Sequence, residues 1–179
     1  MRSLSPLATK TSDTRLSARE MTCLATMGAL MFALKMAMAA LPNIHPVAML
    51  IILTALQFSW RALYAVGVYI LLEGVLFGFG IWWISYLYIW PLLVVFTALL
   101  RKNEGRLFWA ALAAVFGLGF GPLCAIPYFF IGGPSMAFSY WISGIPFDLL
   151  HCVGNFAVTF ALLPTLRSVL SRACGRPAR

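Results

Sequence analysis

Three charged side chains inside otherwise apolar stretches are the first candidates for chemistry in this chain. They are one cation, Lys35, and two carboxylates, Glu73 and Asp148. A charge inside a bilayer is costly, so an ionisable residue there is by default a candidate for binding a polar group. Counted from the outer helix ends, the three lie very roughly 9, 10 and 15 Å deep, at about 1.5 Å per residue. We expect them to pair with one another or to bind a ligand in the outer half of a membrane.

A polar stripe along the last apolar stretch is the most specific local pattern. Its members recur at spacings of three or four residues, which confines them to an arc of about 80° on a helix. They are Trp141, Gly144, Asp148, His151, Asn155 and Thr159. The stripe predicts either one wall of a ligand cavity or polar contacts that hold neighbouring helices together.

Aromatic residues are dense near the start of the fourth apolar stretch, and two of them, Tyr86 and Trp90, lie one helical turn apart. Such a pair is suited to stacking on a flat ring, although Trp and Tyr also form belts at headgroup depth. His45 lies in a short connection bounded by prolines that could close over an outward pocket, although we expect His45 itself to be an exposed turn residue. The predicted substrate-binding residues are Lys35, Glu73, Tyr86, Trp90, Trp141, Asp148, His151 and Asn155.

The elements that must position these side chains are membrane helices. The chain has 179 residues, of which 62% are hydrophobic and 10% charged, and its mean hydropathy is +0.91. That is too apolar for a soluble core of this size, and a membrane helix needs roughly 20 mostly apolar residues. We expect an all-α integral membrane protein with six transmembrane helices, at about 21–41, 46–60, 62–80, 84–100, 107–130 and 138–166. The boundary at Arg61 is the least marked, because no Gly or Pro lies near it.

The basic residues indicate the topology. Twelve of the 13 Lys and Arg residues lie outside the apolar stretches, and every second connection is basic. The positive-inside rule therefore predicts that both termini are cytoplasmic. We expect a disordered basic leader at 1–17, a six-helix membrane domain at 18–170 and a basic tail at 171–179. Basic charge confined to one membrane face favours contact with the lipid bilayer and argues against nucleic acid.

The first helix carries small residues on one side. Ala29, Ala33 and Ala37 recur every four residues, and Lys35 points roughly 140° away from them. Small side chains let helix backbones approach closely in lipid, so this stripe predicts docking, either within the chain or on a separate subunit. Ser17 and Glu20 have the spacing of a capping box that would start this helix.

The sequence contains none of the common catalytic or metal motifs, such as HExxH, GxSxG or a P-loop. The cysteines show no CxxC spacing, and we interpret them as packing residues rather than a disulfide framework or zinc site. They are Cys23, Cys124, Cys152 and Cys174. We expect no enzyme, no cofactor and no metal; a membrane-embedded hydrolase using Asp148 and His151 is a distant alternative.

These features together resemble the substrate-binding S component of energy-coupling factor (ECF) transporters. The resemblance covers about residues 20–166 and rests on six helices, the alanine stripe and two strings, FGIWW at 79–83 and PFDLLH at 146–151. It implies a subunit of the bacterial cytoplasmic membrane that captures a vitamin-like small molecule from outside. Its implied partners are a transmembrane coupling subunit, contacted by Ala29, Ala33 and Ala37, and two cytoplasmic ATPases.

Two further expectations accompany the resemblance. Family members that take up cobalt or nickel need an amino-terminal histidine, whereas this chain has Arg2, so metal uptake is disfavoured. The main alternative function is a six-helix structural scaffold in a membrane complex such as the cell-shape machinery.

Overall fold

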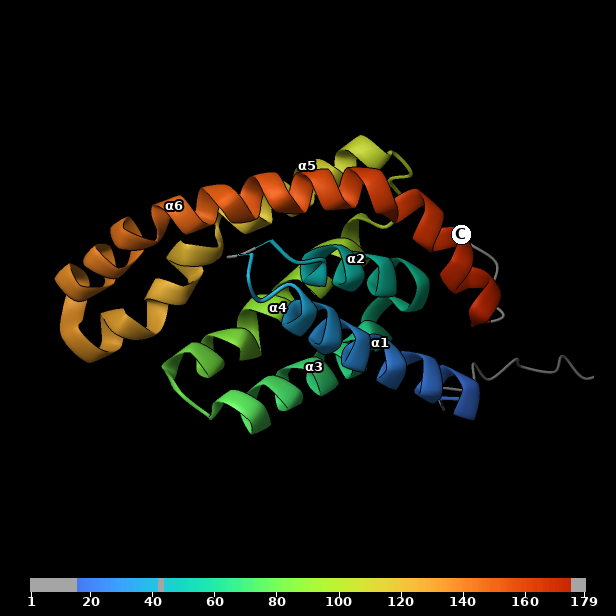
Figure 1. Cartoon of the computed structure of the whole chain (residues 1–179), viewed down its shortest axis with the longest axis horizontal. Helices are drawn as coiled ribbons and strands as arrows, with labels where there is room; N and C mark the ends of the chain where they lie inside the picture. Colours follow the sequence, from blue (N-terminus) through green and yellow to red (C-terminus); the bar gives the residue numbers. More distant parts are fainter. Residues whose placement is uncertain (1–15, 42–43, 175–179) are drawn as a thin grey trace, which may run out of the picture.

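The computed structural model describes residues 16–41 and 44–174 and contains helices but no strand in those ranges (Figure 1). The helices are α1 (Ala18–Ala37), α2 (Val47–Phe58), the 3-10 turn η1 (Ser59–Arg61), α3 (Ala62–Phe77), α4 (Ile81–Leu100), α5 (Arg106–Leu118) and α6 (Phe120–Ala173). Four continuous helical stretches, 18–37, 47–77, 81–100 and 106–173, are long and apolar enough to cross a membrane. The prediction of an all-α, multi-pass membrane protein is confirmed at this level.

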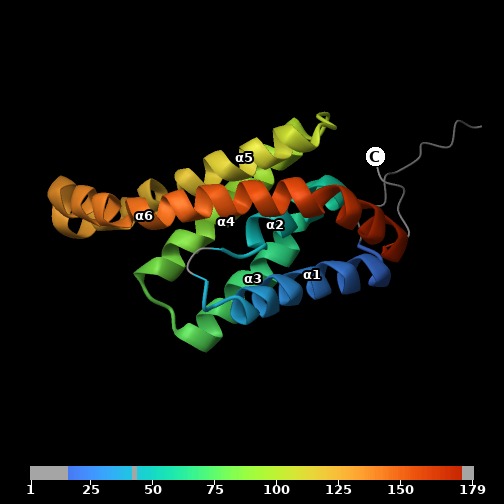
Figure 2. The same cartoon turned by 45° about the horizontal axis from the view of Figure 1, so that its top comes forward.

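The longer stretches are divided at η1, at Gly119 between α5 and α6, and within α6. At η1 the chain turns through Ser59, which has a positive φ of 55°, so the helix breaks close to the boundary predicted at Arg61. Within α6 the backbone leaves helical geometry at Gly132 and Gly133, and Gly133 has a φ of 76° that favours glycine. Figures 1 and 2 show α6 reversing direction there, so that its longer part returns along α5.

The start of α1 is fixed by the predicted capping box. The Glu20 amide donates to the Ser17 hydroxyl at 3.2 Å, and the Ser17 amide donates to the Glu20 carboxylate at 3.1 Å. Further along, α1 packs closely on α3 at Gly28, where a Cβ would lie 2.5 Å from the carbonyl oxygen of Ala65. At the other end of the chain, α6 continues to Ala173, within the range predicted for the tail.

One end of the molecule gathers the start of α1, the end of α6 and the connection between α4 and α5 (Figure 1). Arg61 reaches the Glu20 carboxylate at 3.0 Å, which ties η1 to the start of α1. Much of the predicted leader, with the last residues of the tail and Pro42 and Asn43, lies outside the described residues.

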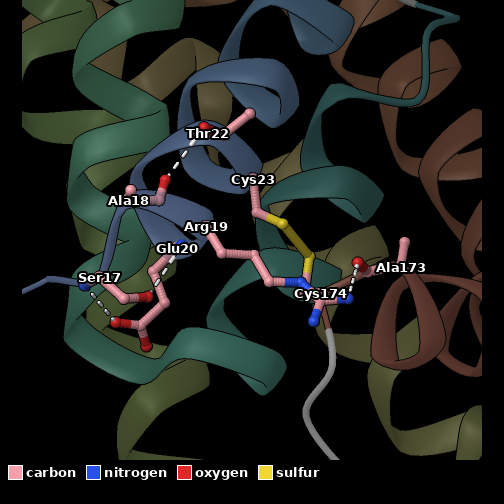
Figure 3. The surroundings of a disulfide bond; sticks show 8 residues. All are labelled: Ser17, Ala18, Arg19, Glu20, Thr22, Cys23, Ala173 and Cys174. Atoms are coloured by element: carbon pink, nitrogen blue, oxygen red, sulfur yellow. Dashed lines mark hydrogen bonds between the residues drawn. A yellow bond between two sulfur atoms is a disulfide. The ribbon is translucent and has the colours of Figure 1, made fainter.

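The interpretation of the cysteines is wrong for two of them. Cys23 near the start of α1 and Cys174 after α6 form a disulfide, with their Cα atoms 6.3 Å apart (Figure 3). Beside it, the Arg19 guanidinium donates to the Ala173 carbonyl at 2.8 Å. The two cysteines are 151 positions apart in sequence and meet because the start of α1 lies beside the end of α6. A spacing motif cannot reveal such a pair. Cys124 and Cys152 have free thiols.

Candidate functional site

A cavity of about 440 Å³ lies at the other end of the bundle, between α1, α3, α4 and α6. It is reached by the last turns of α1 and α3, the first turns of α4 and the connection that precedes α2. The side chains that matter for its chemistry are Lys35, His45, Glu73, Tyr86, Phe120 and His151. Four of the eight predicted substrate-binding residues therefore line one cavity.

An ion pair at the cavity joins α1 to α3. The Lys35 ammonium lies 2.6 Å from Glu73 Oε2 and donates to the Tyr86 hydroxyl at 3.3 Å. The Glu73 side chain is 1% exposed and that of Lys35 is 23% exposed, so a buried carboxylate is paired with a partly exposed ammonium. The second oxygen, Glu73 Oε1, is buried and has no hydrogen-bond partner among the described residues.

Two imidazoles face each other across the cavity wall. The rings of His45 and His151 are 5.4 Å apart in an edge-to-face arrangement. His151 is 1% exposed, and neither of its nitrogens has a hydrogen-bond partner in the described part of the chain. The Nδ1 atom of His45 is also buried without a partner there. These nitrogens are unused donors and acceptors at the edge of the cavity.

His45 was expected to be an exposed turn residue, and that expectation is wrong: its side chain is half-buried and lines the cavity. Burial, and after it the nearby positive charge of Lys35, lowers the pKa of His45 from 6.5 to about 4. His45 is therefore neutral at neutral pH. Its signal in the sequence was its place in a short connection bounded by prolines.

The aromatic wall consists of Tyr86 and Phe120, with Trp90 behind them. Tyr86 and Phe120 line the cavity, with their ring centres 6.1 Å apart. Trp90 is fully buried and contacts both rings, at 5.5 Å from Tyr86 and 5.2 Å from Phe120. Trp90 therefore supports the wall and does not itself line the cavity. Phe120 was not among the predicted residues, because a lone phenylalanine beside Gly119 and Gly121 carries no distinctive pattern.

Two residues of the polar stripe, Asp148 and Asn155, bind backbone groups instead of lining the cavity, whereas His151 between them does line it. Asp148 Oδ1 accepts the Gly121 amide at 2.9 Å, and the Asn155 amide donates to the Ala113 carbonyl at 3.1 Å. Gly121 also leaves room for the Asp148 carboxylate, which a Cβ there would contact directly. Asp148 thus satisfies a backbone group near the break between the helices, and Lys35 pairs with Glu73 rather than with Asp148.

Trp141 is separate from the cavity. It lies beyond the reversal in α6, is 38% exposed and packs edge-to-face on Phe138 at 6.2 Å. The structure does not bring it together with the other predicted residues.

The small-residue stripe of α1 lies on the outside of the bundle. Ala29, Ala33 and Ala37 are exposed, whereas Leu24 and Met31 on the same helix are buried. Lys35 is directed inward, to Glu73. The two sides of α1 are therefore distinct, with one side at the cavity and one side of small residues facing out.

Among the described residues, no group of three or more His, Cys, Asp and Glu side chains is arranged to hold a metal ion. The chain matches no protein-family model, no curated protein and no solved structure.

Proposed function

We propose that this protein is the substrate-binding membrane subunit of an ATP-driven ECF importer and that it captures a vitamin or related heterocycle in the cavity beside Lys35 and Glu73. The observation that carries the proposal is the set of buried polar atoms at that cavity without partners in the described chain, namely Glu73 Oε1, His45 Nδ1 and both nitrogens of His151. A buried polar group without a hydrogen bond is costly, so a ligand that supplies those bonds would stabilise the site.

The size and walls of the cavity support a small-molecule ligand. A volume of about 440 Å³ is within the range of pockets for small molecules. The aromatic side chains of Tyr86 and Phe120 line the cavity, which suits contact with a flat heterocycle. No nucleophile is hydrogen-bonded to His151 in the described residues, so the site has the features of binding more than those of hydrolysis.

The direction of capture follows from the charge distribution. In the proposed topology six helices cross the bacterial cytoplasmic membrane, and both termini and the basic connections are cytoplasmic. Arg19, Arg61 and the basic connection at 101–106 belong to the end of the bundle opposite the cavity. The cavity would then open on the outer side of the membrane, where a nutrient arrives.

The outward alanines of α1 suit the docking role in this proposal. Ala29, Ala33 and Ala37 would contact a transmembrane coupling subunit, which in turn would bind two cytoplasmic ATPases. The exposure of all three supports a partner outside this chain over packing within it.

Calorimetry on the purified full chain in detergent tests the proposal against a panel of B vitamins and related heterocycles. We expect one compound to bind, and Glu73→Gln to weaken its binding. Glu104→Gln is the matched control, because it makes the same chemical change at an exposed residue on the connection between α4 and α5. Absence of binding across the panel, with a folded protein, would contradict the proposal.

A structural scaffold is the second candidate, and the exposed aromatic residues at the reversal of α6 favour it. Phe130 is 80% exposed and Phe138 is 60% exposed, which suits a partner helix as well as lipid. Affinity purification in mild detergent separates the two functions: ATPases would co-purify with an importer subunit, and cell-wall machinery with a scaffold.

A further inference from the structure

The two charged side chains that line the cavity have opposite signs, so their net charge is zero. Among the described side chains that line it, Lys35 and Glu73 are the charged ones, and they form a single ion pair at 2.6 Å. The remaining lining residues are aromatic, apolar or imidazole side chains, and His45 is neutral at neutral pH because burial and Lys35 hold its pKa near 4. An incoming ligand therefore meets a polar surface without net charge.

Because Lys35 and Glu73 are already paired, neither charge attracts an ionic ligand strongly. The Lys35 ammonium already donates to Glu73 Oε2 and to the Tyr86 hydroxyl. An anionic group would have to compete with Glu73 for the same ammonium while lying close to a carboxylate that is 1% exposed. Like charges repel strongly where water is excluded, so that arrangement is unfavourable. A cation would meet the same difficulty beside Lys35.

Uncharged hydrogen-bonding groups, in contrast, find unused partners. Glu73 Oε1 can accept an N–H or O–H from a ligand without disturbing the bond from Lys35 to Oε2. His45 and His151 offer nitrogens that donate or accept according to tautomer. The aromatic side chains of Tyr86 and Phe120 line the same cavity.

We infer that the cavity selects a flat heterocycle with no net charge, one that donates a hydrogen bond to Glu73 Oε1 and presents a mixed donor and acceptor edge to His45 and His151. This inference rests on the proposed function, because it assigns a ligand class to the same cavity. Phosphorylated and carboxylated forms of the same ring are disfavoured.

Pairs of compounds that share a ring and differ in charge test the inference. The probes are nicotinamide against nicotinate, pyridoxine against pyridoxine 5′-phosphate, and riboflavin against its 5′-phosphate, each titrated into the full chain by calorimetry near neutral pH. For any ring that binds, we expect the uncharged member to bind about tenfold more tightly or better, since one logarithmic unit is the lower end of what a neighbouring charge contributes.

The outcomes separate the inference from the function on which it rests. Equal or tighter binding of the anionic member overturns the inference and leaves the capture function standing. No binding by any pair, with a folded protein, overturns both.

A variant with altered charge should change the ratio of affinities for the neutral and anionic members of a pair. A purely structural role of Glu73 would leave that ratio unchanged. Glu73→Gln preserves shape but leaves Lys35 without its carboxylate, so we expect the preference to shift by about tenfold toward the anionic member. The double variant Lys35→Gln/Glu73→Gln removes both charges and should retain the preference for the neutral member, even if the single variant is poorly folded. Glu104→Gln should leave the ratio unchanged. An unaltered ratio in a folded Glu73→Gln protein, or an anion preference in the double variant, would overturn the inference.

Discussion

The ion pair of Lys35 and Glu73 sets the electrostatics of the cavity, because the carboxylate has almost no contact with solvent. Lys35→Met would leave the Glu73 carboxylate buried without its cation, at 1% exposure. We expect a loss of about 3 kcal/mol in the free energy of unfolding, near the low end for buried pairs, because the Lys35 side chain is 23% exposed. Thermal unfolding in detergent measures the change.

A second variant shows whether that loss comes from the unpaired charge. Lys35→Met/Glu73→Gln removes the stranded carboxylate and should recover part of the lost stability. If the double variant were no more stable than Lys35→Met, the charge would not be the cause.

His45 makes the stability of the folded protein depend on pH. Its pKa is about 4 in the folded protein against an ordinary value of 6.5, so between those values the unfolded chain binds more protons. Stability contributed by neutral His45 is therefore present above about pH 6.5 and is lost as the pH falls toward 4. We expect the unfolding midpoint to fall between about pH 7 and pH 5, and to fall less in His45→Gln. Equal slopes for the two proteins would contradict this assignment.

At the scale of elements, the outward side of α1 makes a prediction that is independent of the cavity. Ala33 is exposed, and a leucine there would fill the space into which a partner helix packs. We expect Ala33→Leu to leave ligand binding unchanged and to reduce uptake by cells about tenfold, which corresponds to roughly 1.4 kcal/mol of docking free energy.

Ala161→Leu makes the same change at an exposed residue of α6 and should leave uptake unaffected. Equal uptake by the Ala33→Leu protein and the unaltered protein would remove α1 as the docking element.

Elements were easier to predict from the sequence than the contacts between them. Apolar length and basic connections indicated the helical segments, and Gly132 and Gly133 fell inside a predicted connection. The periodic stripe on α6 was recognised, but Asp148 and Asn155 bind backbone groups of Gly121 and Ala113. Every residue has such backbone groups, so residue types cannot predict these partners. Asp148 and Asn155 therefore looked like ligand-binding residues, whereas Asp148 joins two parts of α6 and Asn155 joins α6 to α5.

The cavity itself combines residues from distant parts of the chain, which limits what periodicity can predict. Lys35, Glu73 and His151 were singled out because polar residues are rare in apolar helices. Their meeting depends on how α1, α3 and α6 pack, and His45 enters only because the connection before α2 folds over the same end. The rarity of polar residues in apolar helices predicted the candidates, and tertiary packing determined which of them line the cavity.

At the scale of the whole molecule, the disulfide between Cys23 and Cys174 closes the bundle by joining its first and last helices. A crosslink across 151 positions restricts the unfolded chain, and such bonds typically contribute about 2–4 kcal/mol. In purified, oxidised protein we expect a reductant to lower the unfolding midpoint by several degrees, at roughly 2–4 °C per kcal/mol.

Cys23→Ser should start from the lower midpoint and not respond to reductant, whereas Cys124→Ser should respond like the unaltered chain, because Cys124 is free. Thiol titration of the denatured, unreduced protein gives the decisive count: only Cys124 and Cys152 should react, and reaction of all four cysteines would show that the crosslink does not form.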